Sequence, residues 1–534
     1  MSSISNPDQP SWQTIAAKKR AEVAAKIPSQ WRLPSHYTDK VEETSNWNVL
    51  NVPRECGVLS ARELEITESY DAVALVDAIA LEIYTAEEVA IAFCKRAAIA
   101  QQLTRCCTEI IFDEAIATAK DLDTYFRLHG RVKGPLHGLP ISVKDGFNIK
   151  GYDSTSGYVS FIGRKAEANA PLVDILLESG AVIHVKTNIP LTLMTADSHN
   201  NIYGRVLNPH NISLTAGGSS GGEGALVAMR GSLLGIGTDI AGSIRIPALC
   251  CGTYGFKPSI GRIPSAGQAQ TSRAGSPGFP ACTGPLATSL RSTQLLMQTV
   301  LAAQPWNRDP GVIPVEWRTT QTRRSLTIAV IGEDTNYPFH PPVRRVLNEA
   351  VAALQKAGHR IKTLDTPSIY DASMLAFKLF TLDSTLTPLR HIEASGEPPI
   401  PSMKTSLPDF GTMQPPTLDD LWGWNAQKAE FTAQWHQIWV ENDLDAIIMP
   451  GHNKTASPHD TYGYPPYTVV WNLVDWPACI IPYGKVDPSL DAVDGHDPGI
   501  YANAPCALQI VGRRFQDEHL SAVAEIINAD LARK

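Results

Sequence analysis

Apolar residues recur at helical spacing along several stretches of the chain. Thr85 and Glu88 fit a capping box, and Val89, Phe93 and Ala97 behind them fall on one face of a helix. Similar patterns predict helical structure in five places: 12–27, 70–127, 171–179, 343–357 and a C-terminal segment around 520–527. Glycine follows two of these patterns directly, which is typical of a helix C-terminus.

Short apolar runs between turn residues predict strands over 139–143, 181–185, 326–331, 360–364 and 445–449. The alternation of these runs with helical patterns is typical of an α/β fold. Proline and aromatic residues predict irregular chain over about 395–425. We expect residues 1–60 to form an N-terminal helical arm and residues 61–534 a single domain, because no linker composition divides them.

Composition excludes several classes of protein. Of the 534 residues 43% are hydrophobic and only 19% are charged, which excludes a disordered or charge-driven chain. A net charge of −8 argues against nucleic-acid binding. We find no signal peptide and no apolar run long enough to cross a membrane, so we expect a cytoplasmic protein. The nine cysteines and fourteen histidines show no metal-ligand spacing, so we expect reduced thiols and no metal.

Glycine and serine concentrate in residues 217–224 (GGSSGGEG) and 235–245 (GIGTDIAGSIR). No lysine follows at the spacing of a phosphate-binding loop, and Ile240 stands where a dinucleotide fingerprint needs its third glycine. Residues 217–221 fit the G-x-S-x-G elbow of α/β-hydrolases, but the turn-like residues 208–215 lack the strand that must precede it. Glycine lets a backbone approach a ligand closely, so we interpret the block as part of a binding site.

Ser243 is the candidate nucleophile of this block. The small residues before it can turn their amide N–H groups together into a nest that suits a developing oxyanion. A serine needs a base, and Lys144 at the end of an apolar strand is a candidate if burial keeps its amine neutral. Lys144 would also serve as a structural ion-pair partner, for instance of Asp145 beside it.

A resemblance to the amidase signature family rests on the segments 138–145 (GLPISVKD), 186–188 (KTN), 217–245, 252–258 (GTYGFKP) and 284–286 (GPL). It extends over most of residues 70–530. The segments 467–472 (YTVVWN) and 475–478 (DWPA) resemble the fungal acetamidase and general amidase branch.

The resemblance implies an α/β/α fold with a large mixed β-sheet core covered by helices on both faces. It implies a Ser–cis-Ser–Lys triad, with Ser243 as nucleophile, Ser219 as the bridging serine after a cis peptide bond, and Lys144 as base. Ser220 is the competing bridging residue. The substrate-binding residues that it implies are Leu193, through its carbonyl, and Ser219, Ile240, Ala241, Gly242 and Ser243.

The implied activity is cofactor-free hydrolysis of a small carboxylic amide, and a homodimer would fit the family. Alternatives are a tailoring amidase acting on a specialised metabolite, whose substrate residues 370–430 would set, and a glutamine-dependent amidotransferase subunit. A fatty-acid-amide role is less favoured because no N-terminal anchor is visible. A non-catalytic binding protein is disfavoured because all three triad residues are present.

Three further features of the sequence concern the surroundings of the candidate site. Ala241 stands where many family members carry glycine, and its methyl group could narrow the pocket or weaken the oxyanion hole. Asp239 and Arg245 flank the nucleophile and are expected to be a structural pair that holds the loop. Large aromatic residues are more often core than pocket wall, and this applies to Trp422, Trp424, Trp471 and Trp476.

Overall fold

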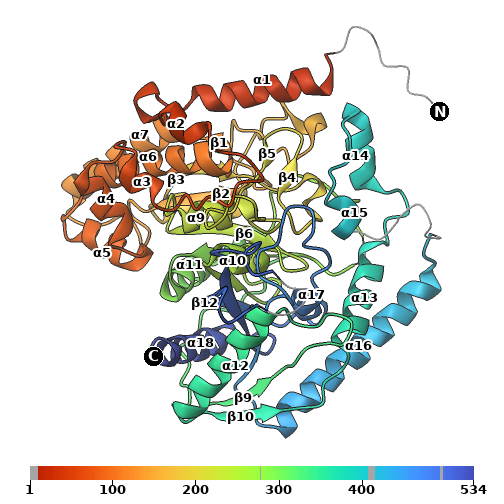
Figure 1. Cartoon of the computed structure of the whole chain (residues 1–534). Helices are drawn as coiled ribbons and strands as arrows, with labels where there is room; N and C mark the ends of the chain where they lie inside the picture. Colours follow the sequence, from red (N-terminus) through yellow and green to blue (C-terminus); the bar gives the residue numbers. More distant parts are fainter. Residues whose placement is uncertain (1–9, 277, 407–414, 493–496, 534) are drawn as a thin grey trace.

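A computed structural model describes residues 10–276, 278–406, 415–492 and 497–533. Its centre is a mixed sheet in the order β1-β3-β2-β6-β8-β7-β12-β13-β11-β9-β10 (Figure 1). A separate short hairpin pairs β4 with β5. The strands are β1 Cys107–Ile110, β2 Pro140–Lys144, β3 Val182–Thr187, β4 His199–Asn200, β5 Gly204–Arg205, β6 Leu234–Asp239, β7 Tyr254–Lys257, β8 Cys282–Ala287, β9 Thr327–Val330, β10 Arg360–Thr363, β11 Ala446–Met449, β12 Ala478–Lys485 and β13 Pro505–Val511.

Helices pack on the sheet and surround it, which gives the α/β/α arrangement expected from the sequence (Figure 1). The helices are α1 Trp12–Ala25, α2 Ser35–Thr38, α3 Val52–Glu55, α4 Ala61–Glu68, α5 Ala72–Ala80, α6 Ala86–Thr104, α7 Phe112–His129, α8 Pro171–Glu178, α9 Gly221–Ala228, α10 Arg245–Cys251, α11 Leu290–Ala302, α12 Pro341–Lys356, α13 Ile369–Phe380, α14 Thr387–Ser395, α15 Met403–Ser406, α16 Leu418–Glu441, α17 Pro466–Leu473 and α18 Asp517–Leu531. Short 3₁₀ turns lie at Ser29–Trp31, Val159–Phe161, Leu191–Leu193 and Pro305–Asn307. No helix among the described residues is both long and apolar enough to span a bilayer.

The direction of chain winding reverses at β2. The chain passes from β2 through α8 to β3 on one side, and then through α9 to β6 on the other side of β2. All three strands are parallel. Because such crossovers are right-handed, α8 and α9 cover opposite faces of the sheet. In sheets of this kind the carboxyl end of the strand at the reversal is the usual place for a ligand site.

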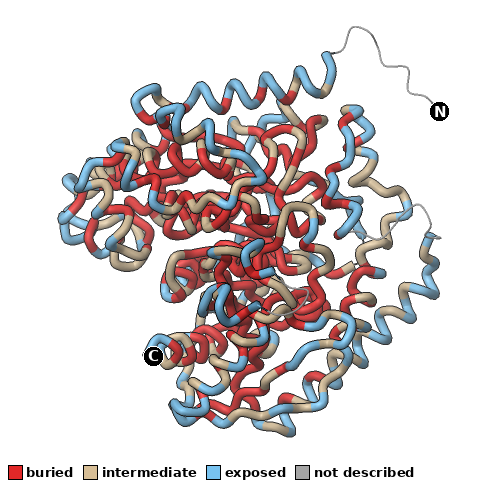
Figure 2. The backbone as a smooth tube through the Cα atoms, viewed as in Figure 1, coloured by how far each residue is buried: buried red, intermediate tan, exposed pale blue. Residues whose placement is uncertain are grey.

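The central strands are buried on both faces, as Figure 2 shows for the middle of the molecule. Strands covered on both faces are near-continuous apolar runs rather than alternating patterns. This explains why β2 and β3 were predicted to within two residues, as 139–143 and 181–185. The capping box predicted at Thr85 and Glu88 is present at the start of α6, and Val89, Phe93 and Ala97 are fully buried.

Two predictions about local structure were wrong. The helical region expected over 70–127 is interrupted by β1, a four-residue buried strand that pairs antiparallel with β3 at the edge of the sheet. The irregular chain expected to about 425 ends earlier, because α16 begins at Leu418 behind a capping box of Thr417 and Asp420. Residues 407–414 of that stretch lie outside the described residues.

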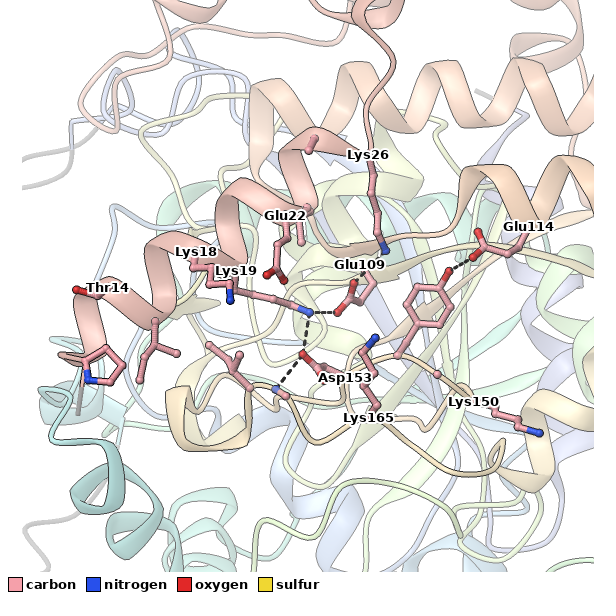
Figure 3. A pocket seen from close by; sticks show the side chains of 18 residues that line it. Thr14, Lys18, Lys19, Glu22, Lys26, Glu109, Glu114, Lys150, Asp153 and Lys165 are labelled. Atoms are coloured by element: carbon pink, nitrogen blue, oxygen red, sulfur yellow. Dashed lines mark hydrogen bonds and ion pairs between the residues drawn. The ribbon is translucent and has the colours of Figure 1, made fainter. Parts of the chain in front are cut away.

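One buried lysine links the N-terminal helix α1 to the body of the protein, in addition to Arg20, which donates to the Ile202 carbonyl at 2.7 Å. Lys19 donates to Glu109 of β1 and, at 2.8 Å, to Asp153, and Figure 3 shows it reaching from α1 toward both carboxylates. A groove of about 1210 Å³ lies beside this contact. Although it is large, none of the residues predicted for the site lines it.

Replacing Lys19 by alanine is expected to lower the free energy of unfolding by about 3–5 kcal/mol, because buried Asp153 loses its cation and buried Glu109 keeps only Lys26, at 3.7 Å. Urea denaturation would measure the change. Lys18→Ala is the matched control, since Lys18 is an exposed lysine of the same helix and should change stability by less than about 0.5 kcal/mol. Equal stability of the two variants would show that the Lys19 contacts do not anchor α1.

Candidate active site

Lys144 is the last residue of β2, at the winding reversal. Its side chain is buried, and Nζ donates to Ser219 Oγ at 2.7 Å and to Thr238 Oγ1 at 2.8 Å. Thr238 lies near the carboxyl end of β6. Because β6 is the parallel neighbour of β2, Thr238 and Lys144 lie at the same end of the two strands. The parallel pairing of two strands thus explains how groups so distant in the sequence meet.

The surroundings of Lys144 favour its neutral amine. Burial lowers the pKa of Lys144 to about 7, although the carboxylates of Asp239 and Glu223 oppose this effect. The structural ion pair with Asp145 does not form: Asp145 accepts from Thr108 at 2.7 Å and from the Ser156 amide at 2.7 Å. A buried lysine with a near-neutral pKa and only hydroxyl partners is suited to act as a base.

Ser219 lies just before α9, and the peptide bond between Gly218 and Ser219 is cis. Gly218 packs so tightly that a Cβ atom there would lie 2.3 Å from the carbonyl oxygen of Thr195. The rival bridging serine, Ser220, has a buried hydroxyl without a hydrogen-bond partner among the described residues. Its amide instead donates to the Ser243 carbonyl at 3.1 Å, which ties the two serine loops together.

Ser243 lies in the loop between β6 and α10 and is 9% exposed. The loop is held by Asp239, whose carboxylate accepts from the amides of Gly242 at 2.8 Å and Ile244 at 3.1 Å. Arg245 donates to both oxygens of Asp239, at 2.9 and 3.0 Å, so the expected structural pair is present. Burial alone would raise the pKa of Asp239, but the Arg245 guanidinium holds it well below its usual range.

Arg245 connects this loop to the C-terminal half of the chain. It donates to the Thr468 carbonyl at 2.9 Å, to Gln509 at 2.7 Å and to Asn472 at 2.6 Å. Asn472 belongs to the segment 467–472 that resembles the fungal branch. Two residues of that segment, Thr468 and Asn472, therefore help to hold the loop that carries Ser243.

The backbone before Ser243 leaves three amides available. The Gly242 amide is used by Asp239, whereas the amides of Ile240, Ala241 and Ser243 donate to no group in the described structure. Gly242 has φ +127°, which only glycine adopts readily. Ala241 lies outside the positive-φ region, so its methyl group causes no backbone strain, and its carbonyl accepts from Thr468 at 2.6 Å.

A cavity of about 30 Å³ opens at these residues. It is lined by Leu193, Ile240, Ala241 and Ser243, four of the residues predicted for the site. Ser219 lies behind the lining, against Lys144. No hydrogen bond joins the hydroxyls of Ser219 and Ser243 among the described residues. Apo active sites often show such contacts lengthened.

Sequence reasoning missed most of the cavity wall. Phe377 and Phe380 at the end of α13 face the cavity, as do Met194, Ile246 and Pro465. Periodicity could have placed the two phenylalanines on one helix face, but not against Ser243. The tryptophans do not line the cavity. Trp471 and Trp476 are core residues, as expected of large aromatic side chains, whereas Trp422 is 63% exposed on α16.

Thr192 and Leu193 both have positive φ, at 71° and 61°. Two consecutive left-handed residues other than glycine are uncommon and tend to occur where a site dictates the backbone. Leu193 lines the cavity, so this strained turn fixes the backbone that faces Ser243. No group of three or more potential metal ligands occurs in the part of the chain that the structure describes.

Comparison with known proteins identifies relatives over nearly the whole chain. A family model described as Amidase matches residues 88–520. An amidase of Gibberella moniliformis is 39% identical over 97% of this chain and 98% of its own length. An acetamidase of Emericella nidulans is 39% identical over 96% of this chain and 97% of its own length.

Solved structures agree with these relatives. A fatty acid amide hydrolase superposes with a TM-score of 0.91 at 32% identity, covering 97% of this chain and 96% of that chain. A peptide amidase from Stenotrophomonas maltophilia shares the fold, with a TM-score of 0.68 at 20% identity over 87% of this chain and 97% of that chain.

Proposed function

The chain belongs to the amidase family and is a hydrolase acting on amide C–N bonds, and from this premise we propose that it cleaves a small carboxylic amide through an acyl-enzyme on Ser243. The observation that carries the proposal is the buried amine of Lys144, hydrogen-bonded to Ser219 behind the cavity that Ser243 lines. A buried amine and two serines that lie close to the carboxyl ends of β2 and β6 support the proposed roles of base, bridging hydroxyl and nucleophile.

The first half of the reaction forms the acyl-enzyme. Neutral Lys144 takes the proton of Ser219 as Ser219 takes the proton of Ser243, and Ser243 Oγ attacks the carbonyl carbon of the amide. The carbonyl π electrons move onto oxygen. On collapse the C–N bond breaks, Ser219 gives its proton to the leaving nitrogen, and Lys144 returns one to Ser219. Ammonia or an amine departs and an ester of Ser243 remains.

The second half repeats the relay with water. Water gives a proton through Ser219 to Lys144 and attacks the ester carbon, and the ester C–O bond breaks as Ser243 regains its proton. We assign the oxyanion donors to the free amides of Ile240, Ala241 and Ser243. Gly242 takes a supporting role, since its amide is used by Asp239 and its backbone provides the turn.

The size of the cavity supports a small acyl group. Its volume of about 30 Å³ holds roughly two water molecules, which suits the methyl and carbonyl of an acetyl group. The name of the Emericella nidulans relative, an acetamidase, points the same way. The similarity to a fatty acid amide hydrolase raises a second candidate class, but a long acyl chain would require the wall of Phe377 and Phe380 to move.

Ammonia release from acetamide, butyramide and benzamide tests the proposal. We expect kcat/KM to be highest for acetamide and lowest for benzamide, because the cavity wall excludes larger acyl groups. Absence of release from all three by a folded protein would overturn it in favour of a tailoring amidase with an elaborate substrate. Release that requires an added partner subunit would favour the amidotransferase.

The cytoplasmic location, the single domain and a homodimer stay predictions.

A further inference from the structure

Glu223 is a buried carboxyl group that the proposed relay does not use. It lies in the first turn of α9, four residues after Ser219, and is fully buried. Its carboxylate accepts hydrogen bonds from Ser142 Oγ at 2.5 Å and from Thr187 Oγ1 at 2.9 Å. Both partners belong to the strands that carry and flank Lys144.

The strand register places Glu223 on the same side of the sheet as Lys144. Ser142 precedes Lys144 by two positions on β2, and side chains two apart on a strand point to the same face. Thr187 is the cross-strand partner of Lys144 on β3. Glu223 therefore binds the neighbours of Lys144 both along its strand and across to the next.

Among the described carboxyl groups with no exposed surface, Glu223 is the one without an ion pair, although the slightly exposed Asp309 and Glu397 also lack one. Asp239 is paired with Arg245, and Glu109 with Lys19. A buried carboxyl without a cation is expensive to maintain, and its retention needs an explanation. The one basic group whose charge acts on it is Lys144.

The fold makes specific room for this carboxyl. A Cβ atom at Gly235, in the middle of β6, would lie 1.9 Å from Glu223 Oε2 and 2.5 Å from Ser142 Oγ. Glycine inside a strand weakens it and is tolerated where another group approaches closely. Gly235 thus gives the carboxylate its place between α9 and the sheet.

We propose that Glu223 is a positioning residue whose negative charge sets the protonation state of Lys144, the base of the proposed relay. This inference rests on the proposed function. The charged groups that act on Lys144 are Asp239 and Glu223. Arg245 already compensates Asp239, which leaves Glu223 as the uncompensated charge; besides Lys144, it acts on the buried Cys107 thiol.

Glu223 and Lys144 have nearly the same pKa. Burial raises the pKa of Glu223 to about 7, against the hydrogen bonds from Ser142 and Thr187 and the charge of Lys144. Burial lowers the pKa of Lys144 to about 7. Each charge stabilises the other, so the ionised carboxylate holds Lys144 protonated to a higher pH and makes its amine a stronger base when it is neutral.

Replacing Glu223 by glutamine tests this inference through the pH dependence of kcat/KM for acetamide. Without the carboxylate, protonated Lys144 is less stable, so its pKa falls. We expect the acidic limb of the profile to move to lower pH by about one unit. A limb at the wild-type pH, or at a higher pH, would overturn the proposal.

Two further variants complete the test. Glu109→Gln removes another buried carboxyl, one whose charge is not among those acting on Lys144, and should leave the limb in place. Thr187→Val keeps the shape but removes a hydrogen bond to ionised Glu223, so its limb should move the same way by a smaller amount. If Glu223→Gln does not fold, an unmoved limb in Thr187→Val overturns the proposal.

A serine-directed fluorophosphonate separates the two levels of inference. Failure of the wild-type protein to be labelled at Ser243 would overturn the proposed function itself. Labelling at Ser243 with the same pH dependence in the wild type and in Glu223→Gln would leave the nucleophile standing and remove the role of Glu223. Labelling whose acidic limb moves to lower pH in Glu223→Gln supports both.

Discussion

Ser243→Ala is expected to lower kcat/KM for acetamide by about 10⁵-fold, because no acyl-enzyme can form without the nucleophilic oxygen. The oxyanion amides and the cavity would remain and give only a weak residual rate over water. Ammonia release measures the rate. Rapid quenching followed by intact-mass analysis should reveal an acetyl adduct in the wild type and none in the variant.

Ser220→Ala is the matched control for this experiment. Ser220 lies beside the bridging serine, its hydroxyl contacts no partner among the described residues, and alanine retains the amide that donates to the Ser243 carbonyl. We expect its rate to stay within a few-fold of the wild type. A rate lost in Ser220→Ala but retained in Ser243→Ala would contradict the assignment of the nucleophile.

Lys144→Met is expected to lower kcat/KM by about 10³-fold, since the relay loses its general base. Methionine has a similar length and no charge, so it fills the buried space, although the hydroxyls of Ser219 and Thr238 lose a donor. In the wild type, kcat/KM should rise through about pH 7, because burial lowers the pKa of Lys144 to about 7 and only the neutral amine accepts a proton. The variant should lack this acidic limb.

Lys186→Met provides the comparison. Lys186 is a second buried lysine, on the adjacent strand β3, and burial lowers its pKa too. Its amine donates to Ser154 at 2.7 Å and to the Asp153 carbonyl, neither of which belongs to the proposed relay. We expect this variant to lose stability but to keep the acidic limb when rates are counted per folded molecule. An acidic limb that survives in Lys144→Met would exclude Lys144 as the base.

Elements with strong local signals were predictable from the sequence. The capping box at Thr85 and Glu88 and the apolar runs at β2 and β3 are determined within a few residues of chain. Strands such as β6 and β12 were not predicted, because their glycine and proline positions break the apolar pattern. Such strands form because the sheet covers them on both sides, and that coverage is a property of the whole fold.

The candidate site also has some features that the sequence predicted and others that depend on the whole fold. The motif residues Lys144, Ser219 and Ser243 were identified from the sequence because the resemblance rests on unbroken segments around each of them. The residues alone left open whether Lys144 pairs with Asp145 or acts as a base, whereas the resemblance implied Ser219 as its partner. The structure excludes Asp145 and brings in Thr238, a residue that no motif had marked.

By itself, the sequence determined the family, the caps, the strands that consist of apolar runs and the residues around which a site would form. The resemblance implied that Lys144 meets Ser219. The tertiary structure alone decided that Lys144 also meets Thr238, from 94 positions away, that Asp239 uses the Gly242 amide, and that Glu223 lies near Lys144 without an ion pair. The physical reason is that these contacts depend on the order and direction of neighbouring strands. The free energy of burial over the whole sheet sets that order, and no local pattern of residues encodes it.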